Sequence, residues 1–201
     1  MKVLSTIWLP MGALTVCCTL ILVISHTLLA DRIVENIKLE QLKILRTVMT
    51  ADFDNDIYND VKSINYKNTE GHITPIRIYR ARKLQQPVGV VLMPLEAVGY
   101  NGKILLAMGI LYDGKISKMQ IFTHNETEGY GANVHQQNSD WLNIFSQYSI
   151  NTVPLDSWGV VADGGVFDQL SGATITSRGV VNAIRSGLEL YMTEKNTLFL
   201  D

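Results

Sequence analysis

The chain has 201 residues, a formal net charge of −2, and 47% hydrophobic against 18% charged residues. This length fits one globular domain, and the high apolar fraction indicates an additional, unusually apolar segment. A nucleic-acid-binding protein carries a basic face, which a net charge of −2 does not favour. The composition therefore excludes neither a membrane protein nor an enzyme subunit, but it gives no reason to expect a nucleic-acid partner.

The apolar segment lies at the N-terminus. From Val3 through Ala30 the chain has 28 residues without Lys, Arg, Asp or Glu, whereas a helix needs only about 20 apolar residues to cross a bilayer. A cleavable signal peptide has a shorter apolar core, of roughly 7–15 residues, and small residues at its cleavage site. The run ends in Thr-Leu-Leu-Ala without such a site. We therefore predict an uncleaved transmembrane anchor over residues 1–30, followed by one domain over residues 31–201.

The cysteines and histidines do not predict a metal or disulfide site. Cys17 and Cys18 are the only cysteines and both lie in the apolar run, so the soluble part has no disulfide and no thiolate cluster. A lipoprotein cysteine is the alternative for Cys17, although Val16 before it is bulkier than expected there. The four histidines lack the paired spacing of metal ligands on one element.

Charge alone gives an uncertain orientation for the anchor. Lys2 precedes the apolar run, while four basic residues follow it closely at positions 32, 38, 43 and 46. The positive-inside bias places such a group in the cytoplasm. A long folded domain is, however, exported largely regardless of its charges, so this bias is a weak guide here.

Periodicity in the remaining residues predicts both helices and strands. Apolar residues recur at helical spacing over 33–49, before an acidic stretch, and Asp113-Gly114 is a strong hairpin signal. The other predicted elements are strands at 73–79, 88–93, 104–111 and 116–121, a helix at 134–148 with Trp141 in the core, and a final helix through Tyr191. The fold class is therefore α+β, an antiparallel sheet flanked by helices.

The stretch from Asp168 to Ile184 is rich in hydroxyl side chains. The apolar spacing predicts that the final helix begins near Thr176 or Ser177, either of which could cap it. A helix N-terminus carries unpaired N–H groups and a partial positive charge, and small residues before it leave room for a phosphate. Local physics leaves two interpretations open, an ordinary helix cap and a phosphate site.

A second polar segment, HNETEGYGANV, runs from His124 to Val134. Gly129 and Gly131 permit backbone shapes that other residues avoid, and Glu126 and Thr127 present polar groups from the same loop. Taken alone, a loop with two glycines is an ordinary turn. Its place in the chain, between GYNGKI with a DGKI hairpin and DGGVFDQLSGATITS, makes it part of a larger pattern.

This ordered pattern resembles the FMN-binding domain of the G subunit of Rnf complexes, which are membrane-bound, ion-translocating electron-transfer machines. Residues 168–174, DQLSGAT, match the flavinylation signature D-x-x-[S/T]-G-A-T of that family. The resemblance implies that a flavin transferase links FMN through its phosphate to Thr174, which makes the chain a phosphoprotein. It implies that Asp168, Ser171, Gly172 and Ala173 form the signature that the transferase fits.

The resemblance also implies the setting of this flavin. Glu126, Thr127, Gly129 and Gly131 are expected to contact the ring or the ribityl chain. The domain is expected on the periplasmic side of a bacterial inner membrane, against the charge bias, where it relays electrons among the other subunits of a translocase. No residue has the arrangement of a nucleophile with a base, so the chain is expected to be an electron-transfer subunit and not a complete catalyst.

Two positions depart from the family loop H-x-E-T-P-G-L-G. Glu128 stands at the proline position and Tyr130 at the leucine position. Loss of proline removes a fixed φ and predicts a more mobile loop; alternatively, Tyr130 offers an aromatic face to the ring. The sequence leaves both effects open.

Two rival interpretations remain at this point. The first is the C subunit of a sodium-translocating NADH:quinone reductase, a related protein with the same flavin in a different complex. The second is a membrane-anchored sensor or binding module that uses the same loop and helix end for a reversible anionic ligand.

Overall fold

The computed structural model describes residues 2–68, 71–135 and 139–200, with the backbone alone for residues 2–7. Contacts divide the chain into two units, Met1–Leu42 and Lys43–Asp201. The first unit is helical, and the second is an α+β domain built on one antiparallel sheet. The predicted fold class is therefore confirmed.

The first unit is the larger part of helix α1, Lys2–Val48. Within it, every side chain from Trp8 to Leu29 is exposed, although most of these residues are apolar. This helix is long and apolar enough to cross a membrane, as a single-pass anchor or as a signal sequence. The apolar run and the predicted helix at 33–49 form one continuous element, because no proline or glycine separates them.

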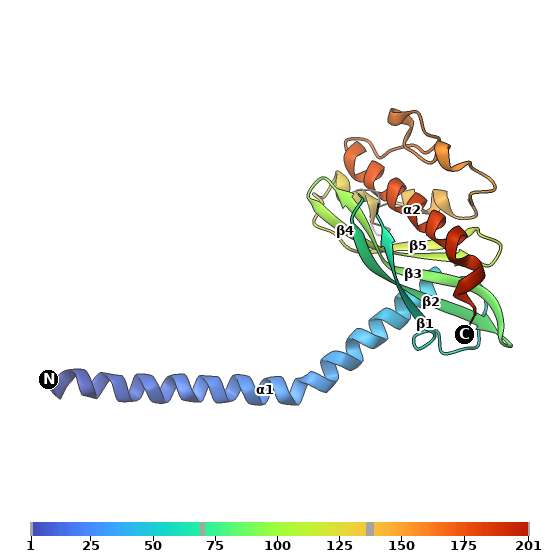
Figure 1. Cartoon of the computed structure of the whole chain (residues 1–201). Coiled ribbons are helices and arrows are strands. Elements are labelled where there is room, and N and C mark those ends of the chain that lie inside the picture. The colour runs from blue at the N-terminus through green and yellow to red at the C-terminus, as the bar shows by residue number, and fades with distance from the viewer. Residues whose placement is uncertain (1, 69–70, 136–138, 201) are drawn as a thin grey trace. The chain divides into compact units, whose positions relative to one another are not determined.

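The sheet of the second unit has five strands in the order β1-β2-β3-β4-β5 (Figure 1). The strands are β1 (Val61–Lys67), β2 (Ile73–Lys83), β3 (Gln86–Gly99), β4 (Gly102–Leu111) and β5 (Ile116–Thr123), each antiparallel to its neighbour. The predicted strands and the Asp113-Gly114 hairpin are present, with Gly114 at φ +91°. Strand β1 was not predicted, because its polar residues alternate with few apolar ones at the edge of the sheet.

Helix α2, Thr174–Leu198, packs across one face of the sheet, mainly on β3 (Figure 1). Leu92 and Leu95 both reach this helix at Gly187, because a register shift between them turns both side chains to the same face. Nearer the N-terminus of α2, a Cβ on Gly179 would collide with the carbonyl of Val98. Glycine at this position therefore lets the start of α2 lie close to the end of β3, where the candidate site is found.

The last turn of α1, which belongs to the second unit, covers the opposite face of the sheet. Leu45, Val48 and Met49 are buried there, and a Cβ on Gly109 would collide with the Val48 carbonyl. Beyond the helix end, the backbone N–H of Thr50 donates to Ser117 Oγ at 2.9 Å. This end of α1 is thus part of the folded domain.

The helix predicted over residues 134–148 is wrong. Residues 136–138 lie outside the described part of the chain, and the flanking segments form two short 3₁₀ helices, η1 (Gly131–Val134) and η2 (Trp141–Phe145). Ser139 Oγ donates to the carbonyl of Asn133, a local bond that competes with helix formation. Trp141 nevertheless lies in the core, as predicted, with 8% of its surface exposed.

Candidate functional site

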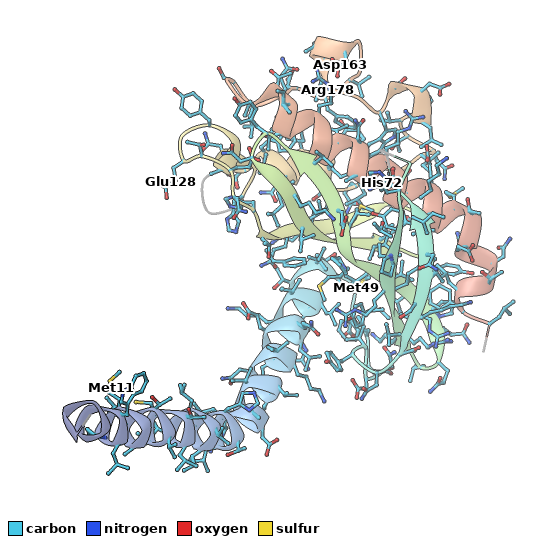
Figure 2. All side chains as sticks on the ribbon, turned by 60° about the vertical axis from the view of Figure 1, so that its left-hand side comes forward. Met11, Met49, His72, Glu128, Asp163 and Arg178 are labelled. Carbon is cyan, nitrogen blue, oxygen red and sulfur yellow. The ribbon has the colours of Figure 1, made fainter. Side chains whose placement is uncertain are left out.

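The loop after β5 directs one acidic side chain into the domain. Glu126 is 8% exposed, while its neighbours Thr127, Glu128 and Gly129 are exposed. The loop turns at Gly129, where φ is +78°, and continues into η1. Figure 2 shows Glu128 at the outside of this loop, so the charge that replaces the family's proline points away from the domain.

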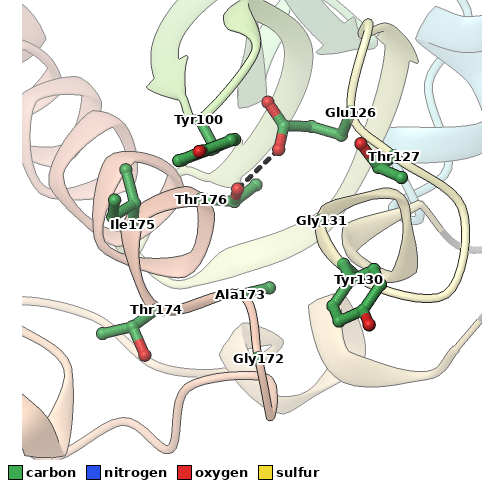
Figure 3. A pocket seen from close by; sticks show the side chains of 10 residues that line it. All are labelled: Tyr100, Glu126, Thr127, Tyr130, Gly131, Gly172, Ala173, Thr174, Ile175 and Thr176. Atoms are coloured by element: carbon green, nitrogen blue, oxygen red, sulfur yellow. Dashed lines mark hydrogen bonds between the residues drawn. The ribbon is translucent and has the colours of Figure 1, made fainter.

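Both carboxylate oxygens of Glu126 accept hydrogen bonds. Thr176 Oγ1 donates to Oε2 at 2.6 Å (Figure 3), and the backbone N–H of Asn101 donates to Oε1 at 2.8 Å. Thr176 belongs to α2 and Asn101 to the β3–β4 turn, so this one carboxylate joins three segments. A buried carboxylate requires such partners, because an oxygen left without its donor costs roughly 1–3 kcal/mol.

Two glycines make room for this carboxylate. A Cβ on Gly99 or on Gly131 would collide with the Glu126 carboxylate, and a Cβ on Gly131 would also lie 2.9 Å from Thr176 Oγ1. Neither position has a positive φ. Gly131 was expected to contact a flavin; in the structure, its lack of a side chain leaves the space that the Glu126 carboxylate occupies.

The signature segment before α2 is held by backbone groups. Trp141 Nε1 donates to the carbonyl of Asp168 at 2.7 Å, and the N–H of Leu170 donates to Ser177 Oγ at 3.0 Å. Gly172 follows in the left-handed region at φ +72°, where only glycine is comfortable. A Cβ there would also lie 3.1 Å from Tyr130 Cδ1, so Tyr130 packs directly over this turn.

Helix α2 begins two residues before the predicted start, at Thr174. Its N-cap is Ala173, which makes no side-chain cap hydrogen bond. The prediction that Thr176 or Ser177 caps the helix is therefore wrong. Both hydroxyls are buried and serve tertiary contacts instead, to Glu126 and to the N–H of Leu170.

Thr174 differs from these two hydroxyl residues. It is half-buried, it occupies the first position of α2, and its hydroxyl makes no hydrogen bond to the rest of the described chain. In Figure 3 its hydroxyl lies away from the Glu126–Thr176 pair. The structure thus separates a free hydroxyl at residue 174 from an engaged hydroxyl at residue 176.

These segments enclose a pocket of about 530 Å³ (Figure 3). Its lining comprises Tyr100, Glu126, Thr127, Tyr130, Gly131, Gly172, Ala173, Thr174, Ile175 and Thr176. Small-molecule sites typically range from about 300 to 1,000 Å³, so the volume suits one cofactor. The lining includes one carboxylate and no lysine or arginine.

The structure brings together most, but not all, of the residues singled out in the sequence. Seven of them line the pocket, namely Glu126, Thr127, Tyr130, Gly131, Gly172, Ala173 and Thr174. Asp168, Ser171 and Gly129 do not line it; they shape the two segments that do. Tyr100, Ile175 and Thr176 line it and were not predicted as contacts, although Tyr100 stands in the GYNG turn that belongs to the recognised pattern.

Two histidines lie at the base of the loop. The rings of His124 and His135 are 5.5 Å apart between centroids, and the N–H of Glu126 donates to His124 Nδ1 at 3.3 Å. Burial lowers the pKa of His135 below its ordinary 6.5, and the neighbouring His124 lowers it further. His124 acts as an acceptor only while its Nδ1 carries no proton.

An ion pair lies beside the start of α2 (Figure 2). Arg178 Nη2 donates to Asp163 Oδ1 at 2.7 Å, and Arg178 Nε donates to the other oxygen. Asp163 ends the short helix η4, Val161–Asp163. The hydrogen bond and the charge of Arg178 hold the pKa of the Asp163 carboxyl below its usual range.

The segments that form the pocket are similar to those of known proteins. Residues 99–189, from the β3–β4 turn into α2, match the family model described as FMN-binding domain. The G subunit of the ion-translocating oxidoreductase complex of Photorhabdus laumondii is 37% identical over 161 residues, which cover 80% of this chain and 77% of that protein. The G subunits of the same complex in Stutzerimonas stutzeri and Yersinia pestis are 31% and 34% identical, over 90% and 80% of this chain and 78% and 77% of their own lengths.

The matched region contains every residue that lines the pocket, and the relatives extend the match over most of the chain. The chain therefore belongs to the family of G subunits of Rnf-type, ion-translocating oxidoreductase complexes, with an FMN-binding domain.

Proposed function

We propose that this chain carries FMN covalently on Thr174, through the phosphate, and relays electrons among the other subunits of an Rnf-type complex in a bacterial inner membrane. The observation that carries the proposal is the hydroxyl of Thr174. It is the last residue of the D-x-x-[S/T]-G-A-T signature, it lines the pocket, and it makes no hydrogen bond within the described chain.

The residues present fit this cofactor. Tyr100 and Tyr130 offer aromatic surface to a flat ring, and Gly172 lets the backbone approach a phosphate closely. The first N–H groups of α2 have no side-chain cap and would be available to a phosphate on Thr174, the first residue of the helix. Bound FMN would supply the ability to accept electrons and pass them on.

Attachment requires one group transfer, catalysed by a flavin transferase. Thr174 Oγ1 forms a bond to the phosphorus, and its hydroxyl proton leaves. The bond that breaks joins the same phosphorus to the leaving nucleoside monophosphate of a flavin dinucleotide donor. No oxidation or reduction accompanies this transfer, and a covalent link keeps the cofactor in place where no free FMN is available.

The remaining pocket residues position and enclose the cofactor. The Glu126–Thr176 hydrogen bond fixes the first turn of α2 against the loop, which fixes the backbone of Thr174 two residues earlier. Tyr100, Tyr130 and Ile175 line the pocket with apolar surface that a bound cofactor would cover. The Thr127 hydroxyl, which also lines the pocket, already accepts a hydrogen bond from Asn101 Nδ2 at 3.0 Å.

The test uses the full-length chain, co-expressed with a flavin transferase. We expect a fluorescent band after denaturing electrophoresis for the wild type, and none for Thr174→Val, because valine keeps the shape and removes the hydroxyl. Thr193→Val is the matched control, since Thr193 lies on the same helix and is exposed. Mass spectrometry of a peptide spanning Asp168 to Arg178 locates the adduct.

An adduct on Thr176, or none despite an active transferase, contradicts the proposal. Flavin that binds but is released on denaturation would instead identify the reversible binding module. A chain that assembles with a quinone reductase and not with an Rnf complex would identify the related C subunit.

We also propose that α1 is an uncleaved single-pass anchor and that the FMN-binding domain faces the periplasm. Alkaline phosphatase fused after Asp201 should then be active, and a green fluorescent protein that folds only in the cytoplasm should remain dark. The opposite pair of results would place the domain in the cytoplasm. Retention of the N-terminal residues in the mature protein distinguishes an anchor from a signal sequence.

A further inference from the structure

The pocket has an unbalanced charge once a phosphate is attached. Glu126 already places a carboxylate in its lining, and none of the lining residues is a lysine or arginine. A phosphodiester on Thr174 adds a second negative charge. Anions in partly buried sites are stabilised by nearby cations and by hydrogen bonds to the charged oxygens. The N-terminus of α2 supplies only a partial positive charge.

Arg178 is placed to supply the missing charge. It follows Thr174 by four residues within α2, so the two side chains lie on the same face of the helix, with Cβ atoms about 5–6 Å apart. Its side chain is 40% exposed and so remains accessible from solution. The planar guanidinium, with its fork of donors, matches the oxygens of a phosphate better than a lysine ammonium does.

Asp163 holds this guanidinium by one edge. It accepts from Nε and Nη2, which leaves the Nη1 end of the fork for a further acceptor. The same contact attaches η4 to the first turns of α2, beside the signature segment. A second contact supports this docking, because the N–H of Ala162 donates to Gln169 Oε1 at 3.1 Å.

We propose that Arg178 binds the phosphate of the flavin at Thr174, through the end of its guanidinium that Asp163 leaves open. The inference rests on the proposed function for the identity of the ligand. It adds a residue outside the pocket lining and outside the D-x-x-[S/T]-G-A-T signature, and it explains how a pocket that contains a carboxylate accommodates an anionic group.

The chain offers a matched pair of variants that separates phosphate binding from a structural role. Arg178→Gln and Asp163→Asn break the same ion pair, so a merely structural role predicts equal effects. Phosphate binding predicts unequal ones. With transferase and flavin dinucleotide, Arg178→Gln should slow formation of the fluorescent band by about tenfold or more, the value of a lost hydrogen bond to a charged group. Asp163→Asn should stay close to the wild-type rate.

A second measurement needs no transferase. In the full-length Thr174→Val chain in detergent, FMN and riboflavin are titrated separately by their fluorescence, because riboflavin lacks only the phosphate. Arg178→Gln in this background should weaken FMN binding by about tenfold and leave riboflavin binding unchanged. Asp163→Asn should retain the preference for FMN.

Equal slowing by Arg178→Gln and Asp163→Asn would overturn the inference, as would an FMN-to-riboflavin preference that Arg178→Gln leaves intact. A wild-type chain that acquires no covalent flavin contradicts the proposed function instead. Even then, the titration still decides whether Arg178 recognises the phosphate.

Discussion

The two walls of the pocket are built in opposite ways. The loop wall, from His124 to Val134, turns its carboxylate inward and satisfies both oxygens with hydrogen bonds. The signature wall, from Asp168 to Thr174, uses its polar backbone groups to hold its shape and leaves the Thr174 hydroxyl unbonded within the described chain. The loop wall thus uses its polar side chain for internal hydrogen bonds, whereas the signature wall leaves the Thr174 hydroxyl available for the proposed attachment.

This difference assigns separate tasks to residues of the same type. Thr174 and Thr176 are two residues apart on α2, but Thr176 is 1% exposed and bonded to Glu126. The buried network can stabilise the first turn of α2 without engaging the Thr174 hydroxyl. Rigidity and the proposed attachment would thus depend on different side chains, as a preorganised site requires.

The largest effect is expected where the loop wall is most crowded. Gly131→Ala places a Cβ against the Glu126 carboxylate and 2.9 Å from Thr176 Oγ1. The carboxylate must move and lose a hydrogen bond, which should lower the free energy of unfolding by about 2–4 kcal/mol. Denaturant unfolding of the full-length chain in detergent measures the change.

Gly159→Ala is the control for this change. Its nearest contact would be Gly165 Cα at 3.5 Å, an ordinary distance, and Gly159 has no positive φ. We expect a change within about 0.5 kcal/mol. Equal effects of the two alanines would show that the space around Glu126 does not restrict residue 131.

Features of the fold and of the two pocket walls that depend on neighbouring residues can be predicted from the sequence, and features that depend on distant residues cannot. Strand alternation and the Asp113-Gly114 turn predict the sheet, because these signals are local. The prediction that Thr176 caps α2 was wrong, because its hydroxyl donates to Glu126, 50 residues away in the chain, and does not bond to the backbone of the helix start. Sequence separation of this size leaves no local pattern.

The same limit applies to the glycines and the tyrosines. A glycine in a turn predicts a positive φ, and Gly172 has one. The requirement at Gly131 arises from a neighbouring carboxylate and is visible only in three dimensions. Likewise, Tyr100 and Tyr130 lie 30 residues apart in the chain and line one pocket because the β3–β4 turn and the loop after β5 meet there.

The next expected effect compares the two threonines directly. Thr176→Val leaves a buried oxygen of Glu126 without its donor and should cost about 1–3 kcal/mol. Thr176→Ser keeps the hydroxyl and should recover most of this loss. Thr174→Val removes a hydroxyl that has no partner among the described residues, so the free energy of unfolding should change by less than about 0.5 kcal/mol while the flavin attachment is lost. A larger destabilisation by Thr174→Val than by Thr176→Val would reverse the assignment of tasks.

The smallest expected effect is a pH dependence that arises from His135, the residue that directly follows the loop wall; the signature wall has no histidine. Burial and His124 lower the pKa of His135 below 6.5 in the folded state, so the unfolded chain binds the proton more readily. Stability is therefore complete above pH 6.5 and decreases as pH falls through 6.5 toward the lower folded pKa. His135 is only partly buried, so solvent screening limits the decrease in the thermal midpoint to roughly 1–2 °C.

The measurement of this pH dependence is the difference in thermal midpoint between the wild type and His135→Gln at about pH 7.5 and about pH 5.5, a window chosen around the ordinary histidine pKa. The wild type should lose more stability than the variant as pH falls, because only the wild type has the partly buried His135 ring, whose protonation is opposed in the folded state by burial and by His124. Parallel decreases in both proteins would mean that His135 does not contribute.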